Sequence, residues 1–149
     1  MQVKADLAAE VFRVVGRFRR QLRRSAGQGF DSTPLTESQS ELLWLVGRRP
    51  GISVSAAAAE LGLVPNTAST LVSKLVSGGL LTRSVGATDR RVGQLALAEP
   101  TQQIVDASRN ARRALLAEVL DELDHGQIES LAEGLEVLDT MTRLLQERR

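Results

Sequence analysis

Residues 66–74 combine short hydrogen-bonding side chains with a single cation. They include Asn66, Thr67, Ser69, Thr70, Ser73 and Lys74. An Asn amide can pair with the edge of adenine, and Ser and Thr hydroxyls can reach base edges or phosphate oxygens. Gathered on one face of a helix, these side chains would suit the major groove of double-stranded DNA. An ordinary solvated helix face has the same residue types, so the pattern needs support from its surroundings.

That support comes from a basic segment further along the chain, residues 86–91 (GATDRR). Arg90 and Arg91 at the tip of a turn can reach the minor groove or flanking phosphates, because narrow A·T tracts concentrate negative potential. We expect Asp89 to hold one of these arginines in position through an ion pair. Ordinary turn charges are the alternative, but two adjacent arginines beside an aspartate favour a binding role.

The charge distribution also favours nucleic acid. The formal net charge is only +1, yet residues 64–93 carry four basic and one acidic side chain, whereas residues 94–149 carry six basic and eleven acidic ones. A basic central segment within a nearly neutral chain indicates a polyanionic partner. Residues 1–30 carry seven basic and two acidic side chains. For these N-terminal arginines we favour solvation, or pairing with the acidic C-terminal half, over contact with DNA.

Composition argues against several classes of protein. The absence of cysteine excludes disulfides, thiolate nucleophiles and cysteine-ligated zinc, and His125 is the only histidine. With no Gly-rich phosphate loop and no carboxylate pair, we expect neither an enzyme nor a bound cofactor or metal. No apolar run approaches the roughly 18 residues of a membrane span, and the N-terminus lacks an apolar signal region. A cytoplasmic protein without membrane contact is therefore expected.

The spacing of apolar residues and a capping pattern predict the first two helices of the chain. Leu7, Val11, Val14, Phe18 and Leu22 form one apolar stripe of a helix over residues 4–25. Thr36 and Gln39 form a capping-box pattern that starts a second helix. This helix should end near Arg48, because the following Pro50-Gly51 cannot continue it. Trp44 within it is expected to be a core or pocket-wall residue.

Two short helices then surround a tight turn. Either Ser53 or Ser55 can cap an alanine-rich helix over residues 56–61, which Gly62 ends. Pro65 opens the next helix, since its missing N–H would be unpaired there in any case. The inward stripe of that helix comprises Ala68, Leu71, Val72 and Leu75, and Gly78-Gly79 stops it. This arrangement predicts a helix-turn-helix whose second helix carries the polar residues described first.

A hairpin and two long helices complete the chain. Residues 80–85 and 92–97 read as strands on either side of the basic tip. Apolar spacing then marks one long helix with Ile104, Ala107, Ala111, Leu115 and Val119, and another with Ile128, Leu131, Leu135, Leu138 and Leu145. With the first helix, these stripes expose more apolar surface than a small winged domain can cover, so we expect pairing with a second copy.

The predicted fold is therefore mainly helical, of the α+β winged-helix type. A winged helix-turn-helix lobe occupies about residues 36–98, and dimerisation helices occupy about residues 4–25 and 101–147. The segment 52–97 resembles the DNA-binding core of the multiple-antibiotic-resistance regulator (MarR) family, with D-x-R at residues 89–91 followed by alternating residues that end in L-x-L. The flanking helices agree in order and length, so the resemblance covers nearly the whole chain.

Carried over by position, the resemblance assigns roles to single residues. Asn66, Thr67, Ser69, Thr70 and Lys74 fall on the recognition helix, Arg91 falls on the wing arginine, and Asp89 falls on its partner. Two positions depart from the family. Val64 stands where a capping Ser or Thr is usual, and LAEPTQQ after the second strand replaces L-T-x-x-G.

The resemblance implies a homodimeric, sequence-specific DNA-binding transcription regulator, with repression as the default. It implies a pseudo-palindromic operator and a small aromatic or phenolic effector bound between the dimerisation helices and the lobe. The lack of cysteine argues against the oxidation-sensing members. The alternative is a winged-helix protein-interaction module in which the same Ser, Thr and Arg side chains contact a protein. A steep salt dependence of DNA affinity would decide against that alternative.

Overall fold

The structure, a computed structural model, describes the chain except for residues 28–29, 31–33, 86–92 and 149. The elements are α1 (Gln2–Ala26), α2 (Glu37–Arg48), α3 (Val54–Leu61), α4 (Pro65–Ser77), β1 (Leu81–Val85), β2 (Gly93–Leu97), α5 (Glu99–Asp121) and α6 (His125–Gln146). Helices with one two-stranded sheet confirm the predicted winged-helix fold class. Among the described residues, no helix is both long and apolar enough to cross a membrane.

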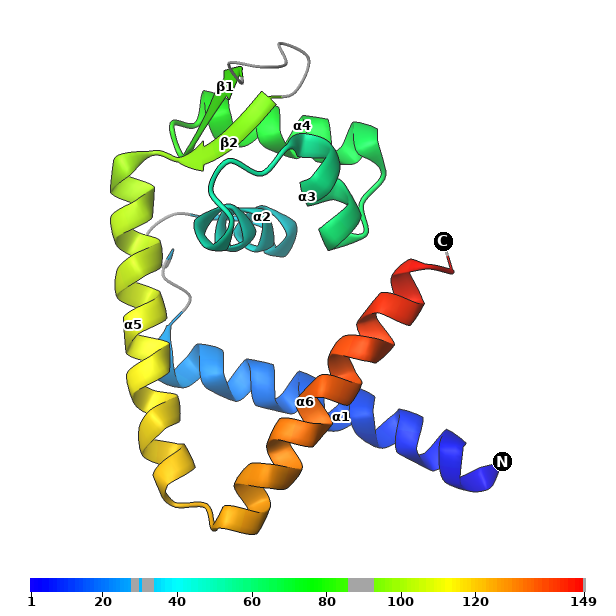
Figure 1. The fold of residues 1–149 in the computed structure, drawn as a ribbon. Coiled ribbons are helices and arrows are strands. Elements are labelled where there is room, and N and C mark those ends of the chain that lie inside the picture. The colour runs from blue at the N-terminus through cyan, green and yellow to red at the C-terminus, as the bar shows by residue number, and fades with distance from the viewer. Residues whose placement is uncertain (28–29, 31–33, 86–92, 149) are drawn as a thin grey trace.

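The helices and the hairpin divide the chain into a lobe and a frame (Figure 1). We call α2, α3, α4 and the β1–β2 hairpin, residues 37–97, the winged lobe. From the end of β2, the long helix α5 runs away from the lobe and leads into α6. Helix α1 lies on the far side of α2 from the hairpin and crosses α6 in this view. The lobe is thus carried at one end of an open frame made by α1, α5 and α6.

Local sequence signals start and stop the helices of the lobe. The Thr36 hydroxyl accepts a hydrogen bond from the Gln39 backbone N–H (3.2 Å), and the Gln39 side chain accepts one from the Thr36 N–H (2.9 Å), which confirms the capping box. Ser53, not Ser55, caps α3 by accepting from the Ala56 N–H (3.1 Å). Gly62 follows α3 in the left-handed conformation (φ 66°, ψ 35°), which glycine adopts without strain.

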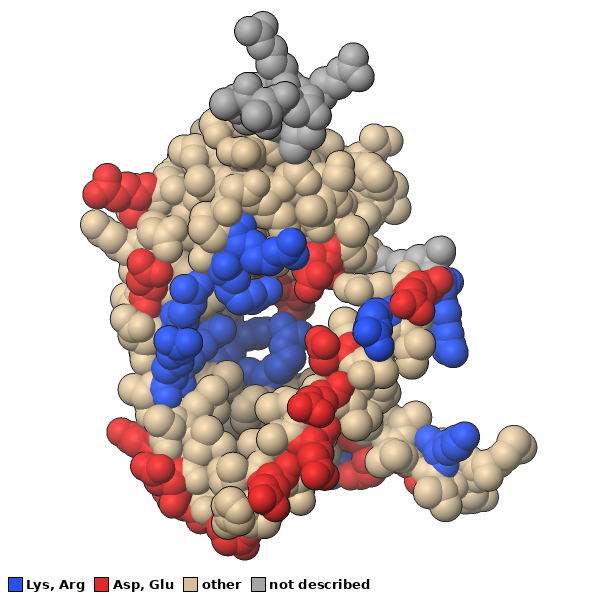
Figure 2. All heavy atoms as spheres, viewed as in Figure 1, with Lys and Arg blue, Asp and Glu red and all other residues tan. Residues whose placement is uncertain are grey.

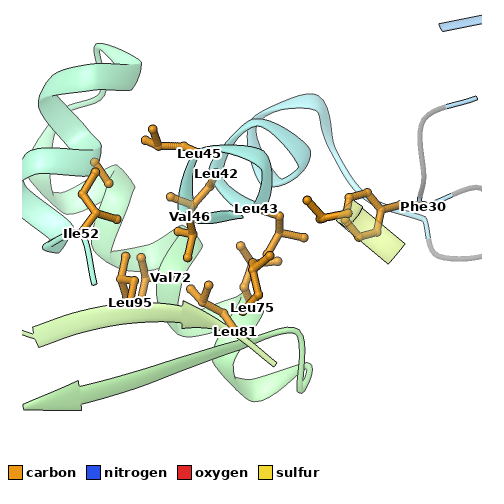
Figure 3. Packing of buried hydrophobic residues seen from close by; sticks show 13 residues of the cluster. Phe30, Leu42, Leu43, Leu45, Val46, Ile52, Val72, Leu75, Leu81 and Leu95 are labelled. Atoms are coloured by element: carbon orange, nitrogen blue, oxygen red, sulfur yellow. The ribbon is translucent and has the colours of Figure 1, made fainter. Parts of the chain in front are cut away.

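The core of the lobe lies between α2, α4 and the hairpin (Figure 3). Its buried side chains include Leu42, Leu43, Leu45 and Val46 of α2, Val72 and Leu75 of α4, and Leu81 and Leu95 of the hairpin. Burying an aliphatic side chain of this size contributes about 1.5–3 kcal/mol. Because α4 is fixed from one side by this core, its opposite side must face outward.

Helix α5 meets the lobe with a face that includes Ile104 of the predicted apolar stripe but not its next two residues. Its buried residues are Thr101, Val105 and Ser108, whereas Ala107 and Ala111 of the stripe are exposed. The contact face therefore consists largely of small side chains, two of them hydroxyls. Apolar periodicity alone could not identify this face, because Thr and Ser count as polar in such a pattern.

The start of α4 offers a test of local energetics. Val64 has the extended backbone of an N-cap (φ −66°, ψ 140°) but no side-chain cap, and its side chain is exposed. Val64→Thr should raise the free energy of unfolding by about 1 kcal/mol, because a Thr hydroxyl can accept from the otherwise unpaired N–H groups of the first turn. Urea unfolding at a fixed protein concentration measures this change. Val64→Ala is the control, and equal stability of the two variants would contradict the prediction.

Candidate nucleic-acid interface

All six polar residues predicted on the recognition helix lie on the exposed side of α4. Asn66, Thr67, Ser69, Thr70, Ser73 and Lys74 are exposed, and Ala68, Val72 and Leu75 are buried. The helix contains no acidic residue. Polyanionic DNA would therefore meet hydroxyl, amide and ammonium groups along this face, without repulsion from α4 itself.

Thr70 differs from the other hydroxyl residues of this face. Its Oγ1 donates to the Asn66 carbonyl oxygen at 2.9 Å within the helix. In this rotamer the Thr70 hydroxyl can only accept further hydrogen bonds, so it cannot donate one to a phosphate oxygen. Thr67, Ser69 and Ser73 have no such backbone bond among the described residues, and remain able to donate.

The strands of the wing pair as predicted. β1 and β2 are antiparallel, in a register that runs from Leu81↔Leu97 to Val85↔Gly93. An isolated bridge between Ser53 and Gln94 also ties β2 to the start of α3. Asp89, Arg90 and Arg91 lie outside the described residues, so the roles assigned to them stay predictions. Hence the hairpin that carries the basic segment is established, at a fixed place beside α3 and α4.

A second site lies between the winged lobe and the frame. A cavity of about 300 Å³, which we call the arginine cavity, is lined by Arg19, Arg23, Leu35, Glu37, Ser40, Glu41, Trp44 and Arg112. In Figure 2, Lys and Arg side chains gather around the hollow between the lobe and α1, whereas Asp and Glu follow α6 and the far end of α5. Trp44 is thus a pocket-wall residue, as expected from the sequence.

Arg112 is the most constrained side chain of this cavity. Its guanidinium stacks on the Trp44 ring, 4.3 Å from the ring centroid, and donates to the Gly27 carbonyl oxygen at 3.4 Å. Within the described part of the chain, its buried Nε has no hydrogen-bond partner. Burial, and the positive charges of Arg23 and Arg19, lower the pKa of Arg112 below its ordinary value. Both effects disfavour the charged form of the Arg112 guanidinium. A nearby anion would favour that charged form and offset both effects.

The N-terminal arginines have other partners than those expected. Arg19 lies 3.4 Å from a carboxylate oxygen of Glu37 and 3.9 Å from one of Glu41, and Arg23 lies 3.6 Å from Glu37. These ion pairs join α1 to α2, so Arg19 and Arg23 do not pair with the acidic C-terminal half, but both side chains stay exposed to solvent, which was the other expectation. The reason is geometric, since α1 passes beside α2, and the acids of α6 lie elsewhere.

The described residues give little support for a metal site. Over residues 1–27, 30, 34–85 and 93–148, no three His, Asp or Glu side chains converge as a metal site requires. His125 forms an exposed pair with Glu129, at 3.0 Å, within α6. The polar sites of the described residues include the outer face of α4 and the arginine cavity.

Comparison with known proteins supports the same fold. Residues 33–92 match the sequence model of the MarR family. No curated protein matches the chain in sequence. A MarR family protein from Bacillus stearothermophilus has a similar structure, with a TM-score of 0.67, 20% identity, and coverage of 93% of this chain and 96% of that one.

Two further solved structures were obtained with bound partners. FabT of Streptococcus pneumoniae, in complex with DNA, has a TM-score of 0.73 at 20% identity, with 97% of each chain covered. CouR of Rhodococcus jostii RHA1, bound to p-coumaroyl-CoA, has a TM-score of 0.63 at 20% identity, with 89% of this chain and 93% of that chain covered. Residues 33–92 therefore match the MarR family in sequence, and nearly the whole chain has a fold similar to that of a solved MarR family protein.

Proposed function

We propose that this protein is a sequence-specific transcription regulator that reads double-stranded DNA with α4. The observation that carries the proposal is the outer face of α4, where six exposed hydrogen-bonding or cationic side chains lie together with no acid among them. The core holds the opposite side of the helix, so this face keeps one orientation relative to the hairpin. A helix presented in this way suits the major groove, and arginines of the wing would contact the flanking minor groove.

The frame supports action as a homodimer. None of the residues of α1 or α6 is buried in the single chain. Between the two helices runs an apolar groove of about 500 Å³, lined chiefly by Leu7, Val11, Val14, Val15, Leu131, Leu135, Leu138 and Met141. Apolar surface of this extent is unstable in water, and a second copy of the same helices would cover it.

A twofold dimer has a direct consequence for the DNA target. It would place two copies of α4 in successive major grooves, on half-sites about 10 base pairs apart. The operator should therefore be pseudo-palindromic. A dimer seated on a promoter would exclude polymerase, so repression is the regulatory outcome that we propose.

The arginine cavity is the proposed site for a small effector. Three guanidinium groups face two carboxylates there, which leaves the cavity with a net positive charge. An aromatic acid fits this chemistry, because its carboxylate could accept from the unpaired Arg112 Nε and its ring could pack beside Trp44. The cavity joins α1, α2 and α5, so an occupant would contact both the frame and the lobe. By linkage, an effector that weakens DNA binding must itself bind less tightly to the DNA complex.

The DNA-reading role of α4 is tested by titration against the DNA upstream of the protein's own gene and against random DNA, at two salt concentrations. Wild type should bind the upstream DNA selectively and with a steep salt dependence. Asn66→Ala should weaken selective binding by about 5- to 100-fold, because a base contact contributes about 1–3 kcal/mol, and should leave random DNA binding unchanged. Arg91→Ala tests the wing in the same assay.

Asn110→Ala is the matched control, since Asn110 is exposed on the side of α5 opposite its buried residues Thr101, Val105 and Ser108. It should bind like wild type. Weak binding of wild type to both DNAs, without salt dependence, would favour the protein-interaction module instead. In that case a selection of genomic fragments bound by the protein would show whether the operator lies elsewhere.

The dimer is tested by placing a charge in the apolar groove. Leu135→Lys should convert the dimer to monomer at micromolar concentration, because pairing would bury an unpaired ammonium group. Sedimentation equilibrium measures the mass. Glu136→Lys on the opposite side of α6 introduces the same cation and should leave the dimer intact. A monomeric wild type, or a dimeric Leu135→Lys variant, would refute this assignment of the interface.

The effector site can be followed by the fluorescence of Trp44, the only tryptophan of the chain. Benzoate should change its emission saturably, and benzyl alcohol, which lacks the negative charge, should not. Arg112→Gln should weaken benzoate binding roughly tenfold or more, since a hydrogen bond to a charged group contributes about 1.5–3 kcal/mol. Arg113→Gln, an exposed neighbour on α5, is the control. Equal responses to the two probes would rule out an anion site.

A further inference from the structure

Arg83 of β1 is a cation that was not among the site residues predicted from the sequence. It stands opposite Leu95 in the strand register, on the side of the hairpin that also carries Leu81 and Leu97. Those three leucines are buried, but Arg83 is exposed. Arg83 therefore lies at the outer end of the hairpin's core-facing side, where the core gives way to solvent near α3 and α4.

The Arg83 side chain crosses the neighbouring strand at Gly93. A Cβ atom added at Gly93 would overlap the Arg83 Nε and lie 3.2 Å from both Cζ and Nη2. Any other residue at this position would have to displace the guanidinium. The absence of a side chain at position 93 therefore leaves the room through which the Arg83 guanidinium passes.

The cleft beside Arg83 is polar, and none of its described lining residues is acidic. It has a volume of about 430 Å³ and is lined by Ser53, Val54, Ser55, Pro65, Ser69, Arg83 and Gly93. Among the described residues, no carboxylate lies within 4.0 Å of the Arg83 guanidinium. Ser55 and Ser69 are exposed, so the cleft is open to solvent, and Ser69 belongs to the outer face of α4. A guanidinium and hydroxyl donors from three elements thus surround one opening.

We propose that this cleft holds a backbone phosphate of the DNA, with Arg83 as the cation and the Ser69 hydroxyl as a second donor. The proposal rests on the function proposed for α4. The planar guanidinium fork suits two oxygens of one phosphate, and the Ser69 hydroxyl lines the same cleft. Because Ser69 shares the phosphate, the contact would set the register of α4 in the groove without reading sequence.

Arg83→Ala tests the phosphate contact through the salt dependence of DNA binding. It should weaken binding about tenfold, equally for the operator and for random DNA, and reduce the slope of log K against log salt by about 1. Arg83→Lys keeps the charge and should keep the slope. Arg113→Ala on α5 removes an exposed cation outside the winged lobe and should change neither quantity.

Gly93→Ala tests the geometry independently of the charge. It should reproduce the loss of affinity seen with Arg83→Ala, because the new Cβ displaces the guanidinium. In a chain that already carries Arg83→Ala, the added Gly93→Ala change should have no further effect. Equal thermal midpoints and circular dichroism spectra would show that each variant folds. If Gly93→Ala weakens binding by the same factor with and without Arg83, Gly93 does not act through this side chain and the proposal is wrong.

The outcomes separate this inference from the function on which it rests. If wild type shows no salt-dependent DNA binding, the proposed function itself fails. If wild type binds DNA and Arg83→Ala has the wild-type slope, only the phosphate contact fails. Inorganic phosphate is the last probe. If it raises the melting temperature of wild type but not of Arg83→Ala, while the DNA slope is unchanged in the variant, the cleft binds a free anion instead of DNA.

Discussion

The burial of α2 is the constraint on which the rest of the molecule depends. Leu43 and Val46 are completely buried, and α2 packs against α3, α4, β2 and α5. Its opposite side faces α1 through the ion pairs of Glu37 and Glu41, and carries Trp44 into the arginine cavity. One helix therefore forms both the back of the lobe that we propose reads DNA and a wall of the proposed effector site.

Acidic and basic side chains gather in different parts of this fold. The carboxylates of α2 hold Arg19 and Arg23 of α1, and most of the remaining acids lie in residues 99–147, on or next to α5 and α6 and away from the outer face of α4. Exposed ion pairs of this kind contribute little to stability, typically about 0–1 kcal/mol. Their larger effect is on where an anion can bind. A nucleic acid is not repelled at α4, and a small anion finds an excess of guanidinium groups in the cavity.

The sequence predicted the elements well because each has local signals. The Thr36 capping box, the turn at Gly62 and the position of Pro65 involve only neighbouring residues, and all three are confirmed. The Asp124–Gln127 capping box that starts α6 has the same type of signal, although the sequence analysis did not use it. By contrast, the stacking of Arg112 on Trp44 joins residues far apart in the chain, and no periodic pattern indicates it. The face of α5 that contacts the lobe could not be predicted for a related reason. Two of its buried residues, Thr101 and Ser108, are polar and do not appear in a pattern of apolar residues.

The shared position of α2 also limits how an effector could act on DNA binding. A close-packed core transmits displacement instead of absorbing it, because its side chains sit in interlocking positions. An anion that drew Arg19 or Arg23 away from Glu37 would loosen the link between α1 and α2 without disturbing the buried side of α2. The lobe would then move as one unit relative to the frame, with α4 and the hairpin keeping their mutual geometry. In a dimer, this movement would change the distance between the two copies of α4. DNA affinity would depend on that distance, because the spacing of the grooves in a duplex is fixed.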